Sequence, residues 1–180
     1  MAINRTFTSA AALLFCATTA FAQAPANDDC GNATAITLGI NAYDATGATD
    51  SLDSIAGATC GVTTIFKDVW FTFTPPMTST YDFETHNSGS GPYDTKLVVY
   101  NTTACPADEL NIIDCIDDGG GPGFLSNLEN LSLTAGVPVL VRVGTFSAAT
   151  GIVPLDLEVR VAPPAPTAPA KRLQLVPTNV

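Results

Sequence analysis

Basic residues are scarce in this sequence, and the shortage excludes one class of partner. Seven lysines and arginines stand against 17 acidic side chains in 180 residues, so the formal net charge is −10. Binding to a nucleic acid needs clustered basic side chains that displace counterions from the phosphate backbone. A nucleic acid is therefore not an expected partner.

Histidine and long apolar runs are scarce as well. His86 is the only histidine, and no run reaches the roughly 18 apolar residues of a membrane-spanning helix. The sequence thus lacks the material for a histidine-rich metal site or a transmembrane segment. Hydrophobic residues nevertheless make up 46% of the chain and charged residues only 13%, a composition typical of a folded protein rather than a disordered one.

Residues 1–22 fit a secretory signal peptide. Arg5 gives a positive start, residues 10–20 are small and apolar, and Ala20-Phe21-Ala22 fits a cleavage site. We expect a secreted protein, extracellular or periplasmic, whose mature chain begins at Gln23.

The mature chain keeps four cysteines, Cys30, Cys60, Cys105 and Cys115. In an oxidising compartment an even number predicts two disulfides, for which three connectivities exist. Sequential pairing, Cys30 with Cys60 and Cys105 with Cys115, is favoured because the second pair brackets a short polar excursion between apparent strands. Zinc binding by the same residues is disfavoured because no CxxC spacing occurs.

Apolar residues alternate with period two, which is typical of β-strands. The clearest case is Leu155-Asp156-Leu157-Glu158-Val159-Arg160-Val161, where apolar and polar residues alternate throughout. The pattern predicts an all-β fold, a jelly-roll-like antiparallel β-sandwich of about eight or nine strands over residues 23–161. The expected strands are residues 69–74, 80–85, 95–100, 127–134, 138–145 and 155–161, with further candidates at 33–38, 42–50 and 110–115. Residues 162–180 are rich in Ala, Pro and Thr and predict a disordered or linker-like tail.

The order of several short motifs resembles the bacterial pre-peptidase C-terminal (PPC) domain family. The motifs are Asn27-Asp28-Asp29-Cys30, Asp68-Val69-Trp70-Phe71-Thr72-Phe73-Thr74, Tyr81-Asp82-Phe83-Glu84-Thr85, Tyr93-Asp94-Thr95-Lys96-Leu97-Val98-Val99-Tyr100, Cys115-Ile116-Asp117-Asp118, Ala135-Gly136 and Val141-Arg142-Val143-Gly144. The resemblance implies a calcium-binding jelly-roll sandwich that accompanies secreted hydrolases or adhesins and binds polysaccharide or collagen-like material without catalysing a reaction. Ile116 replaces an asparagine that relatives often carry, which removes one possible metal ligand.

Acidic residues also gather in turns, independently of that resemblance. Calcium takes about six to eight oxygen ligands with flexible geometry, so carboxylates from two or three loops can hold it. Solvated turns that form local hydrogen bonds are the alternative for any single aspartate. Two groupings are candidates: Asn27, Asp28 and Asp29 with Asp50 and Asp53, as the resemblance implies, or Asp94 with Asp117 and Asp118, as the sequence positions indicate.

No catalytic constellation is convincing. His86 lies near Ser88 and Ser90, but the sequence has no Gly-x-Ser-x-Gly elbow. Asp82 and Glu84 share one strand face, as a glycosidase pair would, although most such pairs are solvated sheet residues. We therefore expect a protein that is not an enzyme.

Aromatic side chains are the candidate ligand-binding residues, chiefly Trp70 and Tyr93. On its strand Trp70 faces away from Val69 and Phe71, so it is either a surface platform or is covered by a loop. The sequence as a whole predicts a secreted, calcium-stabilised binding or accessory module for polysaccharide or an extracellular matrix protein. A self-associating structural or adhesive protein is the alternative, and a small hydrolase is a third.

Overall fold

The computed structural model describes residues 23–51, 55, 64–86, 93–119, 123–150 and 154–164. The expected signal peptide and residues 165–180 of the expected tail lie outside this described part. Cys60 and Asp53, which were named above as a disulfide cysteine and a candidate metal ligand, also lie outside the described residues.

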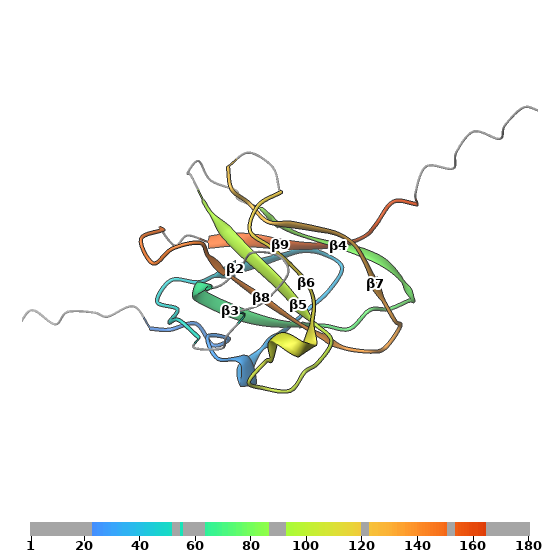
Figure 1. Ribbon diagram of the computed structural model, residues 1–180, viewed down its shortest axis with the longest axis horizontal. Helices are drawn as coiled ribbons and strands as arrows, with labels where there is room; N and C mark the ends of the chain where they lie inside the picture. The colour runs from blue at the N-terminus through green and yellow to red at the C-terminus, as the bar shows by residue number, and fades with distance from the viewer. Residues whose placement is uncertain are drawn as a thin grey trace, which may run out of the picture.

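Within the described residues, nine strands form two sheets that pack face to face, as predicted (Figure 1). One sheet has the order β1-β3-β8-β5-β6 and the other the order β2-β9-β4-β7. All neighbouring strands are antiparallel except β1 and β3. The strands are β1 (Thr34–Ile36), β2 (Gly39–Asp44), β3 (Phe66–Phe73), β4 (Ser79–His86), β5 (Thr95–Tyr100), β6 (Ile112–Ile116), β7 (Asn127–Leu133), β8 (Val139–Thr145) and β9 (Pro154–Val161), and two short 3-10 turns are η1 (Cys30–Asn32) and η2 (Glu109–Asn111).

The connectivity is that of a jelly roll. β2 pairs with β9, β3 with β8, β4 with β7 and β5 with β6. These four pairs follow one another along one long antiparallel ribbon. The ribbon is rolled up, so that β4 also pairs with β9 and β5 also pairs with β8. The jelly-roll prediction is therefore confirmed.

The main core lies between the two sheets. Phe71 and Phe73 of β3 face Tyr81 and Phe83 of β4 across it, and Phe73 makes edge-to-face contacts with both of those rings at 5.4 and 5.6 Å. Period-two alternation puts these residues on one face of each strand. The apolar residues whose alternation predicted the strands are thus the residues that fill this core.

A second, smaller core lies on the outer face of the five-stranded sheet, under loops. Trp70 is fully buried there, stacks on Tyr100 at 5.8 Å and donates its indole N–H to Ser51 Oγ at 3.1 Å. A buried indole cannot offer its face to a ligand, so the prediction of Trp70 as a ligand-binding residue is wrong. The loop-covered alternative is correct.

A buried ion pair holds this second core. Arg142 Nε lies 2.9 Å from Asp68 Oδ2, and the two side chains are 1% and 0% exposed. The guanidinium also lies 5.0 Å from the centre of the Trp70 ring and donates to the Ser51 carbonyl. Asp68 Oδ1 accepts the Ser51 amide at 2.8 Å. The pair therefore fixes the loop that covers the tryptophan.

The disulfide prediction needs correction. The structure joins Cys30 to Cys105, with Cα atoms 5.8 Å apart, rather than to Cys60. Cys115 is disulfide-bonded as well, but the sequential pairing with Cys105 is excluded. The reason is spatial: η1 packs against β3 at the edge of the second core, so Cys30 meets the loop that follows β5 and not its neighbour in sequence.

Breaking the buried pair should be costly. Asp68→Leu removes the carboxylate that pairs with the buried Arg142 charge, and we expect the free energy of unfolding to fall by about 3–5 kcal/mol. The double variant Asp68→Leu with Arg142→Met should lose less, because the buried guanidinium charge is removed together with its carboxylate. Urea denaturation measures both, and a double variant less stable than the single one would contradict this account.

Candidate functional site

Three carboxylates meet at one end of the five-stranded sheet. Asp94 lies immediately before β5, and Asp117 and Asp118 follow β6 directly. β5 and β6 are antiparallel, with Leu97 opposite Ile116, so the start of one strand lies beside the end of the other. One oxygen from each of the three carboxylates lies within 4.8 Å of the others. The second predicted grouping is therefore brought together, and we call it the acidic trio.

Burial and mutual repulsion oppose the ionisation of two members of the trio, Asp94 and Asp117. Burial, together with the charges of Asp117 and Asp118, raises the pKa of the Asp94 carboxyl. Burial and the Asp118 charge likewise raise the pKa of Asp117, while Lys96 lowers the pKa of both groups. A bound cation would relieve this repulsion.

One oxygen of the trio is buried without a hydrogen bond. Asp117 Oδ1 finds no donor among the described residues, although it is shielded from solvent. A buried carboxylate oxygen without a partner is costly. Carboxylate oxygens are the ligands that calcium prefers, so this donor set fits a hard cation.

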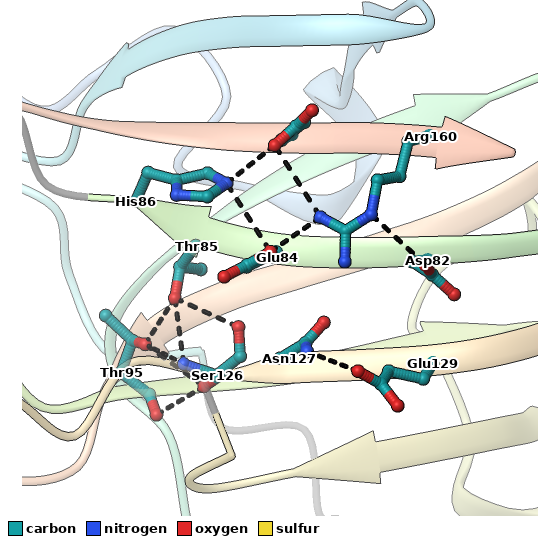
Figure 2. A network of polar contacts seen from close by, with 10 residues as sticks. Asp82, Glu84, Thr85, His86, Thr95, Ser126, Asn127, Glu129 and Arg160 are labelled. Atoms are coloured by element: carbon teal, nitrogen blue, oxygen red, sulfur yellow. Dashed lines mark hydrogen bonds and ion pairs between the residues drawn. The ribbon is translucent and has the colours of Figure 1, made fainter. Parts of the chain in front are cut away.

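Buried hydroxyl groups anchor the trio to the core. Thr85, Thr95 and Ser126 form a cluster in which Ser126 Oγ donates to the Thr95 carbonyl at 2.6 Å (Figure 2). The same Oγ also contacts the Asp117 carbonyl at 3.0 Å. The hydroxyls of Thr85 and Thr95 lie 2.8 Å apart. Through Ser126, this cluster joins the backbone at Thr95, next to Asp94, to the backbone of Asp117.

The first predicted grouping makes other contacts. Asn27 is buried and donates through Nδ2 to the Trp70 carbonyl at 3.0 Å. Asp28 accepts the amide and the hydroxyl of Thr49 at 2.7 and 2.8 Å. Asp50 accepts the amide of Lys67 at 2.8 Å. Asp29 is exposed, and among the described residues these acids do not form a cluster with metal-binding spacing.

Two exposed phenylalanines stand beside the trio. Phe146 donates its backbone amide to the Asp94 carbonyl at 3.0 Å, and Phe124 forms a β-bridge with Asp94. Their side chains are 46% and 57% exposed. Lys96 Nζ lies 4.4 Å from the centre of the Phe146 ring, in a cation–π contact. Exposed aromatic faces thus lie next to the acidic trio.

Tyr93, the second predicted ligand-binding residue, is half-buried at the same end. It lines a pocket of about 10 Å³ together with Tyr43, Asp94 and Thr145. Such a volume accommodates roughly one water molecule. The pocket therefore does not admit a sugar, and a larger ligand would have to bind on the surface around it.

A second polar group covers the outer face of the four-stranded sheet. Arg160 of β9 contacts Asp82 Oδ2 at 3.1 Å and Glu84 Oε2 at 2.6 Å (Figure 2). His86 Nε2 lies 2.8 Å from Glu158 Oε2 and 3.7 Å from Glu84 Oε2. The residues of the hydrolase alternative do converge, but on a sheet face, and they line neither the pocket at Tyr93 nor a groove at Leu38.

Sequence reasoning missed several members of these groups. Phe124 was not considered, and its only signal was an apolar side chain beside a glycine-rich turn. Lys96 was read as an ordinary strand residue. Glu158 and Arg160 were assigned to the solvent face correctly, but their strand, β9, could not be placed beside β4 without the fold.

Comparison of the chain with protein-family models, with curated proteins and with solved structures found no significant match. The class that the fold defines is therefore a two-sheet β-sandwich of five and four strands, without a family assignment. Its disulfide is consistent with an oxidising compartment. Within the described part of the chain, none of the helices has the length and apolar character needed to cross a bilayer.

The raised pKa values of Asp94 and Asp117 predict how these two carboxyls affect stability in the absence of metal. A carboxyl whose pKa is higher in the folded state lowers the free energy of unfolding as pH rises above its unfolded pKa, near 3.9. In EDTA, Asp117→Asn should therefore melt higher than wild type at about pH 7 and lose this advantage at about pH 4.

The matched control for that measurement is Glu129→Gln, which removes one negative charge from an exposed position on β7. Thermal melts of the three proteins decide the matter. A gain for Asp117→Asn that is equal at both pH values would contradict the assignment of the effect to carboxyl ionisation.

Proposed function

We propose that this protein is a secreted, calcium-stabilised, non-catalytic binding or accessory module. The observation that carries the proposal is the convergence of Asp94, Asp117 and Asp118, with the buried and unpartnered Oδ1 of Asp117. Carboxylates crowded in this way need a cation, and the donor set is all oxygen, which suits calcium. The resemblance of the sequence to the PPC family supports the same ion.

The ligand we propose is a polysaccharide or an extracellular matrix protein. Phe124 and Phe146 support this choice because exposed aromatic faces pack against sugar rings and against partner side chains. Their backbones are bonded to Tyr93 and Asp94, so a calcium ion held by the trio would order the surface that carries them. Tyr93 would lie at the edge of that surface.

Calcium should raise the melting temperature. At about 100 times its dissociation constant a ligand adds about 2.7 kcal/mol, which for a domain of this size corresponds to roughly 5–11 °C. Asp117→Asn and Asp94→Asn should abolish the rise, whereas Asp50→Asn should keep it because Asp50 belongs to the other grouping. Melts in EDTA and across a calcium titration measure this. A wild-type melting temperature that ignores calcium would contradict the calcium part of the proposal.

The exposed phenylalanines should govern ligand binding. Phe124→Ala and Phe146→Ala should each weaken binding to an insoluble polysaccharide or to fibrillar collagen by about tenfold or more, as expected for an aromatic hot spot. Met77→Ala is the matched control, since Met77 is also an exposed large apolar residue. Sedimentation assays in calcium and in EDTA measure binding. Equal losses in all three variants would argue against this surface.

A second candidate function, self-association as a structural or adhesive protein, has its own support. Leu38, Met77 and Val137 are 41%, 52% and 51% exposed. Leu38 lines an apolar groove of about 280 Å³ with Phe73 and Pro76. The groove lies at the Phe73 end of β3, whereas the acidic trio lies beyond the Phe66 end. Oligomers that form in calcium without ligand, and that Met77→Ala dissociates, would favour this function.

A further inference from the structure

Two glutamates face each other directly on the outer face of the four-stranded sheet. Glu84 of β4 and Glu158 of β9 are cross-strand partners in register. Like charges placed directly opposite each other destabilise a sheet. Their side chains are only 16% and 27% exposed, which limits the screening that water provides. This pair of carboxylates therefore needs positive charge nearby, part of which the Arg160 guanidinium supplies.

The only histidine of the chain completes the group. His86 Nε2 lies 2.8 Å from Glu158 Oε2 and 3.7 Å from Glu84 Oε2. One ligand atom from each residue lies within 4.8 Å of the others. The side chains come from two adjacent strands, so the sheet itself holds the spacing. An imidazole nitrogen and two carboxylate oxygens are a donor set that differs from the all-oxygen trio.

We propose that Glu84, His86 and Glu158 form a second metal site, one that takes a borderline divalent transition-metal ion, with zinc as the probe. Imidazole nitrogen and carboxylate oxygen are ordinary ligands of such ions, whereas calcium prefers oxygen alone. The ion binds the lone pair of Nε2, so the neutral ring then carries its proton on Nδ1, and the proton that Nε2 donates to Glu158 without metal is passed to water. Three protein ligands leave one position of a tetrahedral zinc ion to water or to an external ligand.

Arg160 supports the site from the other side. Its Nη1 lies 2.6 Å from Glu84 Oε2 and 3.6 Å from Glu158 Oε2, and Figure 2 shows the Glu84 carboxylate between His86 and Arg160. The bond from Arg160 Nε to Asp82 anchors the guanidinium. All of these contacts to the two glutamates use Oε2. Outer partners of this kind orient metal-ligating carboxylates.

Zinc titration of the protein without a histidine tag tests the proposal. Because the chain has a single histidine, the nitrogen-15 resonances of one imidazole ring report the site directly. One equivalent of zinc should shift the His86 Nε2 resonance in a saturable manner, and the same concentration of calcium should not. Calorimetry gives the affinity, which Glu158→Gln and His86→Gln should each lower by about tenfold or more.

Two control variants locate the effect. Glu129→Gln removes an exposed carboxylate on the adjacent strand β7 and should leave zinc affinity unchanged. Asp117→Asn should abolish calcium stabilisation and keep zinc binding, which separates this site from the acidic trio. Circular dichroism and melting in EDTA establish that each variant is folded. An unmoved His86 resonance at excess zinc, or equal affinities for Glu158→Gln and Glu129→Gln, would overturn the proposal.

Discussion

The ion pair between Arg142 and Asp68 is the constraint on which the rest of the structure depends. It lies on the outer face of the five-stranded sheet, a face that an ordinary sandwich exposes to water. Both side chains are buried there because the pair bonds the loop at Ser51, which in turn covers Trp70. The sheet is thereby enclosed on both faces. This explains why every residue of β5 and of β8 is buried.

Tight packing at the neighbouring Gly144 belongs to the same constraint. A Cβ atom at this position would lie 2.6 Å from the Phe66 carbonyl oxygen and 2.9 Å from Asp68 Cβ. No real Cβ contact is this short, so the β3 and β8 backbones can approach only over a glycine. Phe66 and Thr145 are register partners across this approach. On its other side Thr145 pairs with Thr95 of β5. Asp94 of the acidic trio directly precedes Thr95.

Much of the fold followed from the sequence because alternation is a local signal. The predicted strand 95–100 coincides with β5, and 155–161 matches β9 to within one residue. β2 was placed too late: it begins at Gly39, whose φ of 96° suits a corner, and ends where Asp44 accepts the amide of Thr46. The predicted strand extended to residue 50 because the sequence after Asp44 gives no sign of this local hydrogen bond. β3 was begun too late, since the irregularity at Lys67, with φ 47°, interrupts the pattern.

The site was predictable only where chain neighbours meet. Asp94 and the pair Asp117 and Asp118 flank two strands that are adjacent in sequence and in space, so position along the chain indicated their convergence. Glu158 and His86 meet across β4 and β9, and Cys30 meets Cys105 across the second core. Such long-range contacts depend on the topology and on loop packing. Neither has a signature in one sequence read without its fold.

The order of strands along the rolled ribbon also determines when folding can finish. β5 and β6 lie at the closed end of the ribbon and can pair early, because only a short connection separates them. β2 is the first strand of its sheet to leave the ribosome, yet its partner β9 is the last. Sheets dominated by such distant pairings fold slowly. Synthesis can therefore finish on an open chain, and the sandwich closes only when β9 arrives.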